Sequence, residues 1–176
     1  MNIEDYNQPC STGQAPEYTS REYIETGTSI QEKVEMWYLT PLRKMKGHEG
    51  FICLAICFLL YEKFLRRALK MKPEEKFSEG HRVFDEIGQH FEISRAIAYE
   101  FWSHWRNGLL HHGMPEVDKN RTYWMTAAQK EAVKVSNNHV SINPWIIRDT
   151  IVKIIVANRK IWSDADFPLA KELKEI

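Results

Sequence analysis

Residues 94–115 read SRAIAYEFWSHWRNGLLHHGMP, and they predict one long amphipathic helix. Ser94 is a typical N-terminal cap, and Gly113 followed by Pro115 is a typical helix end. Each residue advances ~100° around an α-helix, so apolar positions three or four residues apart share one face. The positions on that face are Ala98, Trp102, Trp105 and Leu109. We expect this face to lie in the core of a helical protein.

A polar stripe is expected beside the apolar face of the same helix. Its members are spaced by four, three and four residues and are Glu100, His104, Asn107 and His111. Arg106 begins between the two faces, and its long side chain can bring the guanidinium to the polar stripe. With His112, the last two turns hold the densest polar chemistry in the sequence.

Arginine and histidine together suit a metal-free cleavage of RNA, in which the 2′-hydroxyl attacks the adjacent phosphate. Imidazole exchanges protons near neutral pH, and a guanidinium offers a planar, permanently charged fork to phosphate oxygens. We assign His111 as general base or acid and Arg106 as the group that binds the developing charge. Asn107 would orient the imidazole or the phosphate.

The spacing of Arg106 and His111 limits this assignment. Five residues correspond to ~140° around an ideal helix, so the two side chains do not share a face. A loosened turn at Gly108 would bring them closer. Alternatively, a symmetric pair of subunits would pool two such helices in one cleft.

The segment Arg106-Asn107-Gly108-Leu109-Leu110-His111 resembles the signature of the HEPN superfamily: an Arg, a polar residue next, and a His five positions after the Arg. The resemblance covers the motif and, more loosely, residues 29–115 and the final helix. It implies a small helical bundle, usually dimeric, that acts as a metal-independent endoribonuclease without a cofactor. Bacterial members often serve defence, stress or toxin systems. RNA, a second copy of the chain and a partner protein such as an antitoxin are therefore the implied partners.

Another class of function stays open beside the nuclease. Some HEPN domains are inactive binding modules, and Arg and His near a helix C-terminus also stabilise the helix dipole. The alternative is a non-catalytic helical interaction module that binds a protein partner or nucleic acid. A metal site built from His104, His111 and His112 is disfavoured because carboxylates and a supporting shell are missing nearby.

Composition bounds how the chain can bind nucleic acid. The 176 residues include 24 basic and 24 acidic side chains, so the formal net charge is zero. This argues against binding nucleic acid through bulk charge, and a nucleic-acid site would have to be a local patch. The candidate substrate-binding residues are Lys63, Arg66 and Arg67, joined by His104 and His112. The three cations also lie near a predicted helix end, where the dipole favours them.

Other features exclude whole classes of protein. Three cysteines without ligand-like spacing argue against a disulfide framework or zinc, and Cys53 and Cys57 are expected to be buried. The N-terminus is polar and the apolar run 51–61 is too short to span a bilayer. A cytoplasmic protein without a membrane partner is expected. No Gly-rich phosphate loop, nucleophile elbow or HExxH motif is present, which argues against common nucleotide hydrolases, α/β-hydrolases and zinc proteases.

The remaining patterns predict a mainly all-α fold, an up-and-down bundle of about four helices with a small β-hairpin before the last helix. Residues 1–28 read as a poorly ordered lead-in, and residues 29–176 as a single domain. Ser29 with Glu32 forms a capping box that starts the first helix. The expected elements are helices at 30–46, 48–72, 79–91 and 94–112, a hairpin at 133–142, and a last helix at 144–161 capped by Asn143.

A homodimer is expected through the helix at 94–112. One reason is the resemblance, because the motif commonly lies at a dimer interface in that superfamily. The second is that Phe101, Trp102 and Trp105 supply more aromatic surface than one core face needs. Such an interface would bury roughly 1,200 Å² or more in total.

Overall fold

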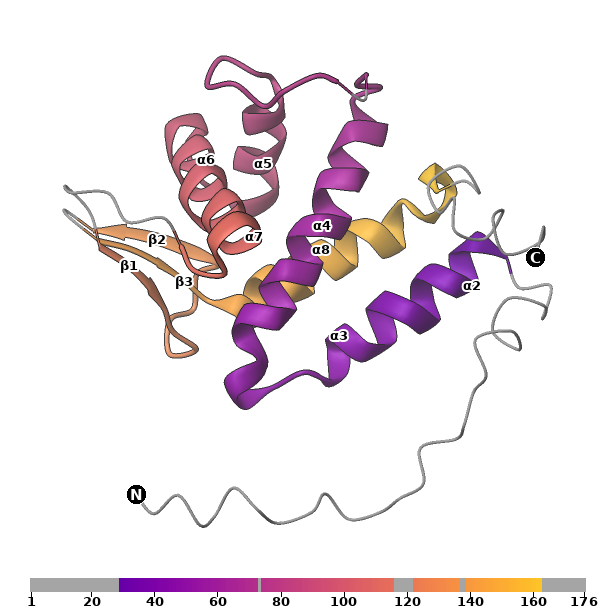
Figure 1. The fold of residues 1–176 in the computed structure, drawn as a ribbon, viewed down its shortest axis with the longest axis horizontal. Helices are drawn as coiled ribbons and strands as arrows, with labels where there is room; N and C mark the ends of the chain where they lie inside the picture. Colours follow the sequence, from indigo (N-terminus) through magenta and orange to yellow (C-terminus); the bar gives the residue numbers. More distant parts are fainter. Residues whose placement is uncertain (1–28, 73, 116–121, 137–138, 163–176) are drawn as a thin grey trace, which may run out of the picture.

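The computed structural model describes residues 29–72, 74–115, 122–136 and 139–162. These residues form a mainly helical fold with one small three-stranded sheet at its side (Figure 1). The mainly helical fold class is therefore confirmed. The predictions for residues 1–28, for the turn at 137–138 and for the tail after Trp162 lie outside the described residues.

The helical elements follow one another as five rods within the described part of the chain. The first rod is α2 (Ile30–Val34), η2 (Glu35–Leu39) and α3 (Thr40–Lys44); then come η3 (Gly47–Glu49) with α4 (Gly50–Ala68), α5 (Val83–Phe91), α6 (Arg95–Phe101) with η4 (Trp102–Asn107) and α7 (Gly108–His112), and α8 (Pro144–Ala157) with η5 (Arg159–Ile161). The elements η2 and η4 are π-helical, and η3 and η5 are 3₁₀ turns.

The first rod begins at the capping box that the sequence predicts. The Ser29 hydroxyl accepts a hydrogen bond from the Glu32 amide at 3.3 Å, and the Ser29 amide donates to the Glu32 carboxylate at 2.7 Å, which is the predicted capping box. The winding widens in η2, just before Pro41. Pro41 has no N–H to continue an α-helical ladder. Just before it, the Thr40 amide donates a hydrogen bond to the Glu35 carbonyl, five residues earlier, which is the π-helical pattern.

Helix α4 runs through the middle of the fold and packs most extensively against α8 (Figure 1). Its apolar sequence buries Phe58, Tyr61 and Leu65 almost completely. Cys53 and Cys57 are fully buried free thiols, as predicted. The helix ends at Ala68, before the expected Lys72, and Lys70 follows in the left-handed conformation with a φ of 51°.

Hydrogen bonds and an ion pair cap α8 and join it to the first rod. The buried Asn143 side chain accepts from the amides of Trp145 at 3.0 Å and Ile146 at 3.3 Å, so it caps α8 as predicted. Arg148 donates to the Met45 carbonyl at 2.9 Å. Beyond the helix, Arg159 pairs with Glu35 at 3.2 Å. These contacts hold the last helix against the first rod.

The sheet contains strands β1 (Thr122–Met125), β2 (Val133–Ser136) and β3 (His139–Ile142) in the order β1-β3-β2. Strands β2 and β3 pair antiparallel, within the span predicted as a hairpin. Strand β1 pairs parallel to β3 and was not predicted. Its Met125 lies against the start of α4, where a Cβ on Gly50 would come within 2.9 Å of the Met125 methyl group.

A hydrogen bond between Tyr61 and His90 joins α4 to α5 inside the fold. The Tyr61 hydroxyl lies 2.7 Å from Nδ1 of His90. Burial lowers the pKa of His90, although the nearby Glu86 carboxylate acts in the opposite direction. Burial also raises the pKa of Tyr61, and Glu86 adds to that shift. The structure therefore favours neutral forms of both side chains.

This environment predicts a pH dependence of stability. Because the folded pKa of His90 lies below its ordinary value, the unfolded chain takes up that proton first as the pH falls. The contribution of His90 to the free energy of unfolding should therefore be fully present above about pH 7. It should decrease as the pH drops through about 6.5 toward the lower pKa of the folded state. Urea melts at about pH 8 and about pH 5.5 test this, with His90→Gln as the comparison. An equal pH slope in both proteins would contradict the assignment.

Candidate functional site

The helix formed by α6, η4 and α7 begins and ends where the sequence predicts. The Ser94 hydroxyl accepts from the Ile97 amide at 3.3 Å, and Gly113 adopts a left-handed φ of 72° at the other end. The predicted apolar face is confirmed, because its four members are at most 6% exposed: Ala98, Trp102, Trp105 and Leu109. The polar residues of the motif are consequently held at the edge of the core.

The predicted polar stripe is wrong as a single row. It assumed α-helical spacing, but residues Trp102–Asn107 are π-helical and hold more residues per turn. The structure splits the stripe into two groups. Glu100 and His104 contact Tyr123 of β1, whereas Asn107 contacts the neighbouring Arg106.

Arg106 is held by three side chains at the edge of the core. One terminal nitrogen donates to the Asn107 side-chain oxygen at 3.0 Å, and the other pairs with the Glu62 carboxylate of α4. The guanidinium carbon lies 5.7 Å from the centre of the Trp102 ring. The Arg106 side chain is 19% exposed, and its Nε has no hydrogen-bond partner among the described residues. The guanidinium is thus fixed in orientation and reaches the surface at one side.

Glu62 is the residue of this site that the sequence analysis missed. Its carboxylate also accepts from Nε of Arg66 at 3.0 Å, so it links the motif to the predicted basic patch. The sequence carries one signal for this, the four-residue spacing of Glu62 and Arg66 on one helix. The contact to Arg106 spans 44 positions and becomes visible only in the fold.

The basic patch on α4 is only partly available to a ligand. Arg66 also donates to the Glu75 carbonyl at 2.9 Å and covers the Phe77 ring at 4.9 Å, so it fastens the segment after α4. Arg67 is exposed and Lys63 is half-buried. Arg66 therefore stabilises the segment that follows α4, and its role in binding substrate stays a prediction.

His111 and His112 lie exposed on the last turn of α7. Their ring centres are 6.4 Å apart. They follow Arg106 on the same continuous helix, and α7 packs against α4, which carries Glu62. The structure thus places an exposed imidazole one turn or so beyond an oriented guanidinium.

His104 belongs to a separate contact. Its ring stacks on Tyr123 with the centres 4.5 Å apart, and the Tyr123 hydroxyl donates to Glu100 at 3.2 Å. This contact connects the helix to strand β1. In this structure His104 packs the sheet onto the helix, and its role in substrate binding stays a prediction.

The aromatic side chains of the motif helix leave no surplus surface for a dimer interface, and the homodimer itself stays a prediction. Phe101 and Trp105 are fully buried and Trp102 is 3% exposed, all within one copy of the chain. Phe58 of α4 approaches both Phe101 and Trp102, with ring centres 5.5 and 6.1 Å apart. The core of a single subunit therefore uses the aromatic surface that was assigned to the partner.

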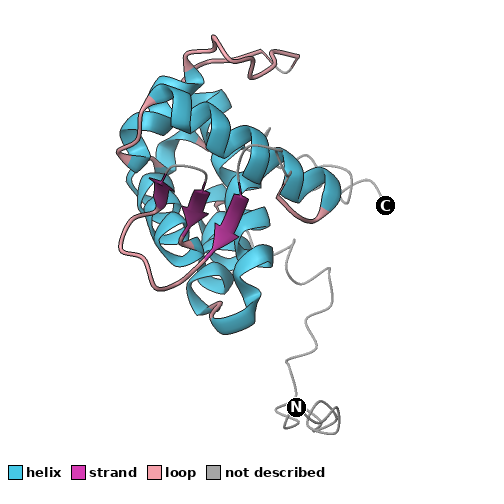
Figure 2. Ribbon diagram, turned by 90° about the vertical axis from the view of Figure 1, so that its left-hand side faces the viewer, coloured by secondary structure: helices cyan, strands magenta, loops and turns pink. Residues whose placement is uncertain are grey.

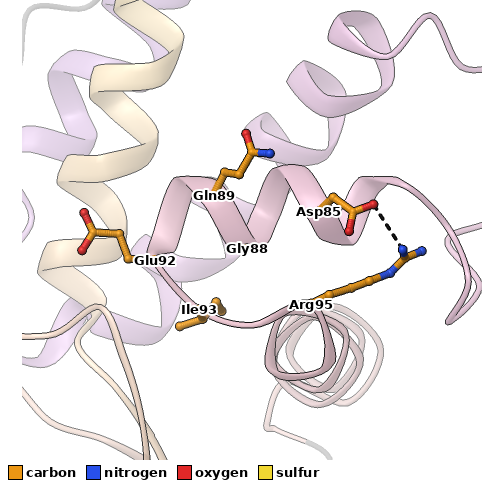
Figure 3. Close-up of a pocket in the computed structure, with 6 residues that line it drawn as sticks. All are labelled: Asp85, Gly88, Gln89, Glu92, Ile93 and Arg95. Carbon is orange, nitrogen blue, oxygen red and sulfur yellow. Dashed lines mark ion pairs between the residues drawn. The ribbon is translucent and has the colours of Figure 1, made fainter.

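A surface pocket of about 380 Å³ lies at the turn between α5 and α6, away from the motif (Figure 3). Asp85 and Arg95 form an ion pair of 3.3 Å at its edge. At Gly88 a Cβ would meet the Ile93 carbonyl oxygen at 2.7 Å, so this corner needs glycine. None of the residues that line the pocket belongs to the motif.

Two further findings concern the described residues as a set. They contain no group of three or more His, Cys, Asp and Glu side chains arranged to hold a metal ion. None of the helices within the described ranges has the length and apolar character needed to cross a bilayer.

Comparisons of this chain with protein-family models, with curated proteins and with solved structures return no match.

Proposed function

We propose that this chain is a metal-independent endoribonuclease of the HEPN type. The observation that carries the proposal is the orientation of Arg106 by Glu62 and Asn107, with His111 exposed on the following turn. A guanidinium with a fixed direction is ready to bind phosphoryl oxygens without reorganisation. An exposed imidazole is free to exchange protons with a bound substrate.

The proposed reaction is an internal transfer within RNA. The 2′-oxygen forms a bond to the adjacent phosphorus, and the bond from phosphorus to the 5′-oxygen breaks. The 2′-hydroxyl loses its proton to a base and the leaving oxygen gains one from an acid, so no water or metal is consumed. His111 performs one of these proton transfers, and Arg106 stabilises the negative charge on the phosphoryl oxygens.

A second copy of the chain would supply the other proton-transfer group. One subunit offers the exposed pair His111 and His112, and a symmetric dimer would bring a second set to the same phosphate. We include this dimer in the proposal on the strength of the resemblance and of the chemistry. A bacterial defence or toxin context, with an antitoxin partner, rests on the resemblance alone.

The proposed function is tested with matched single-stranded substrates in excess chelator. RNA should be cut to fragments that end in a 2′,3′-cyclic phosphate and begin with a 5′-hydroxyl. The same sequence with 2′-O-methyl groups should stay intact, because the attacking hydroxyl is blocked. Cleavage of both substrates would exclude the proposed mechanism.

Glu62 offers a prediction about positioning. Glu62→Gln keeps the shape of the side chain but removes the charge that holds Arg106. The misdirected guanidinium should lower the rate of RNA cleavage by roughly 10²-fold. Glu79→Gln on the surface is the matched control and should leave the rate unchanged.

The same two proteins separate positioning from unfolding. Glu62→Gln should also lower the melting temperature, because the ion pair is only 17–19% exposed and Arg106 keeps its charge, so cleavage is compared at a temperature at which circular dichroism shows both proteins folded. An unchanged cleavage rate in Glu62→Gln would remove Glu62 from the account.

A second candidate function is supported by an exposed apolar face on α4. Ile52 is 61% exposed and Leu59 is 56% exposed, and their seven-residue spacing places them on one side of the helix. Exposed apolar side chains on one helix face favour a protein partner. If the protein cleaves no RNA, a non-catalytic interaction module is the better description.

A further inference from the structure

We propose that the outer face of the sheet binds single-stranded RNA, with a base stacked on Trp124. This inference takes its ligand class from the proposed function, but binding at this face does not require cleavage. Figure 2 shows the three strands in front of the helices, so that one side of the sheet is turned away from the core.

The strand register decides which side chains share the outer face. Residues opposite one another in neighbouring strands point to the same side, and the side alternates along each strand. Val140 and Ile142 of β3 are buried, so their partners face the core. The outer set is Thr122 and Trp124 of β1, His139 and Ser141 of β3, and Lys134 and Ser136 of β2.

Trp124 is the large apolar side chain of this outer set. It is 54% exposed, and its ring centre lies 5.8 Å from that of His139 with the planes 50° apart. A broad, exposed ring beside a second ring is the arrangement on which proteins stack unpaired bases. The polar neighbours make the face unlike the apolar core of a protein interface.

The charge of the outer face also fits RNA. Lys134 supplies a positive charge, and the six outer positions contain no acidic side chain. In a chain with zero formal net charge, such a local excess is what nucleic-acid binding requires. Trp124 on β1 and Lys134 on β2 lie on either side of Ser141 on the central strand β3, so a base on Trp124 and a phosphate near Lys134 would span the width of the sheet.

The outer face is physically joined to the motif helix. Strand β1 presents Trp124 outward, while the adjacent Tyr123 faces inward and stacks on His104 of η4 at 4.5 Å. The Tyr123 hydroxyl also binds Glu100 of α6. Strand β1, which would bind the RNA through Trp124, therefore also packs against the helix that carries Arg106 and His111.

The test measures binding separately from cleavage. All proteins carry His111→Ala, and the probe is a fluorescently labelled single-stranded RNA of mixed sequence in excess chelator, followed by anisotropy. Trp124→Ala should raise the dissociation constant about tenfold or more, since stacking on an aromatic ring contributes on that order. Trp124→Phe should restore most of the affinity. Met36→Ala, another exposed apolar side chain, should have no effect.

Salt dependence adds a second readout. Lys134→Gln should weaken binding and reduce the slope of log K against log salt by about 0.7, as expected for one lost phosphate contact on a single strand. The inference is overturned if the parent protein binds no RNA, or if Trp124→Ala binds as tightly as its parent. It is also overturned if Trp124→Ala changes only self-association in light scattering.

The outcomes for this inference and for the proposed nuclease are distinguishable. If Trp124→Ala weakens RNA binding while His111→Ala cleaves as fast as wild type, the sheet face binds RNA and His111 is not catalytic. If Trp124→Ala leaves binding unchanged while His111→Ala abolishes cleavage, His111 is catalytic and the sheet face does not bind RNA.

Discussion

Replacing His111 with alanine is expected to lower the initial rate of RNA cleavage by about 10²–10⁴-fold, the usual effect of removing a general acid or base. The side chain is exposed on the last turn of α7, so its loss should leave the fold intact. Arg106→Lys should fail in the same assay, because an ammonium does not reproduce the planar fork that Glu62 and Asn107 orient.

The control for this experiment is another exposed histidine. His48 lies in η3, outside the proposed site, and His48→Ala should cleave RNA at the wild-type rate. Circular dichroism should be superimposable for all variants. If His111→Ala and wild type, purified in parallel, cleave equally fast, the activity does not belong to this residue.

Replacing Trp105 with alanine is expected to cost about 3–5 kcal/mol of the free energy of unfolding. Trp105 is fully buried in the core beneath the motif. Its Nε1 has no hydrogen-bond partner among the described residues, so the loss comes from packing and the resulting cavity. For a chain of this size the melting temperature should fall by roughly 10 °C.

Two other tryptophan variants calibrate that loss. Trp105→Phe should cost clearly less than Trp105→Ala, because it keeps a ring and gives up no hydrogen bond. Trp124→Ala removes an exposed ring and should change stability by about 0.5 kcal/mol or less. Equal losses in Trp105→Ala and Trp124→Ala, measured by urea unfolding, would show that the core is assigned wrongly.

Features that depend on nearby residues could be predicted from the sequence. Ser29, Ser94 and Asn143 cap helices as expected, because a cap bonds amides two or three positions ahead. Gly113 ends its helix because glycine takes a positive φ without a steric penalty. The apolar face around Trp102 and Trp105 follows from helical period alone.

Features that depend on distant residues could not be predicted. Strand β1 is four residues long and forms by pairing with β3, which no local pattern encodes. The link from Arg106 to Glu62 joins two helices that are 44 positions apart. The widened η4 breaks the α-helical spacing that predicts one polar stripe, so Asn107 does not follow Glu100 and His104, which both contact Tyr123.

The burial of the aromatic residues within one subunit could not be predicted either. The sequence contains more aromatic residues than one face of an isolated helix needs, namely Phe101, Trp102 and Trp105, and this excess predicts a dimer. In the fold Phe101 and Trp102 lie against Phe58 of α4, Phe101 also lies against Phe91 of α5, and Trp105 is fully buried. How many sides of a helix are covered depends on its neighbours, which helical period does not reveal.

The central claim is tested most directly by the initial rate of cleavage of single-stranded RNA by the wild-type protein in excess chelator. The account predicts metal-free cleavage that leaves 2′,3′-cyclic phosphate ends and is lost in His111→Ala. No cleavage of any RNA tested, at protein concentrations that permit a dimer, would contradict it, and the chain would then be described as an interaction module.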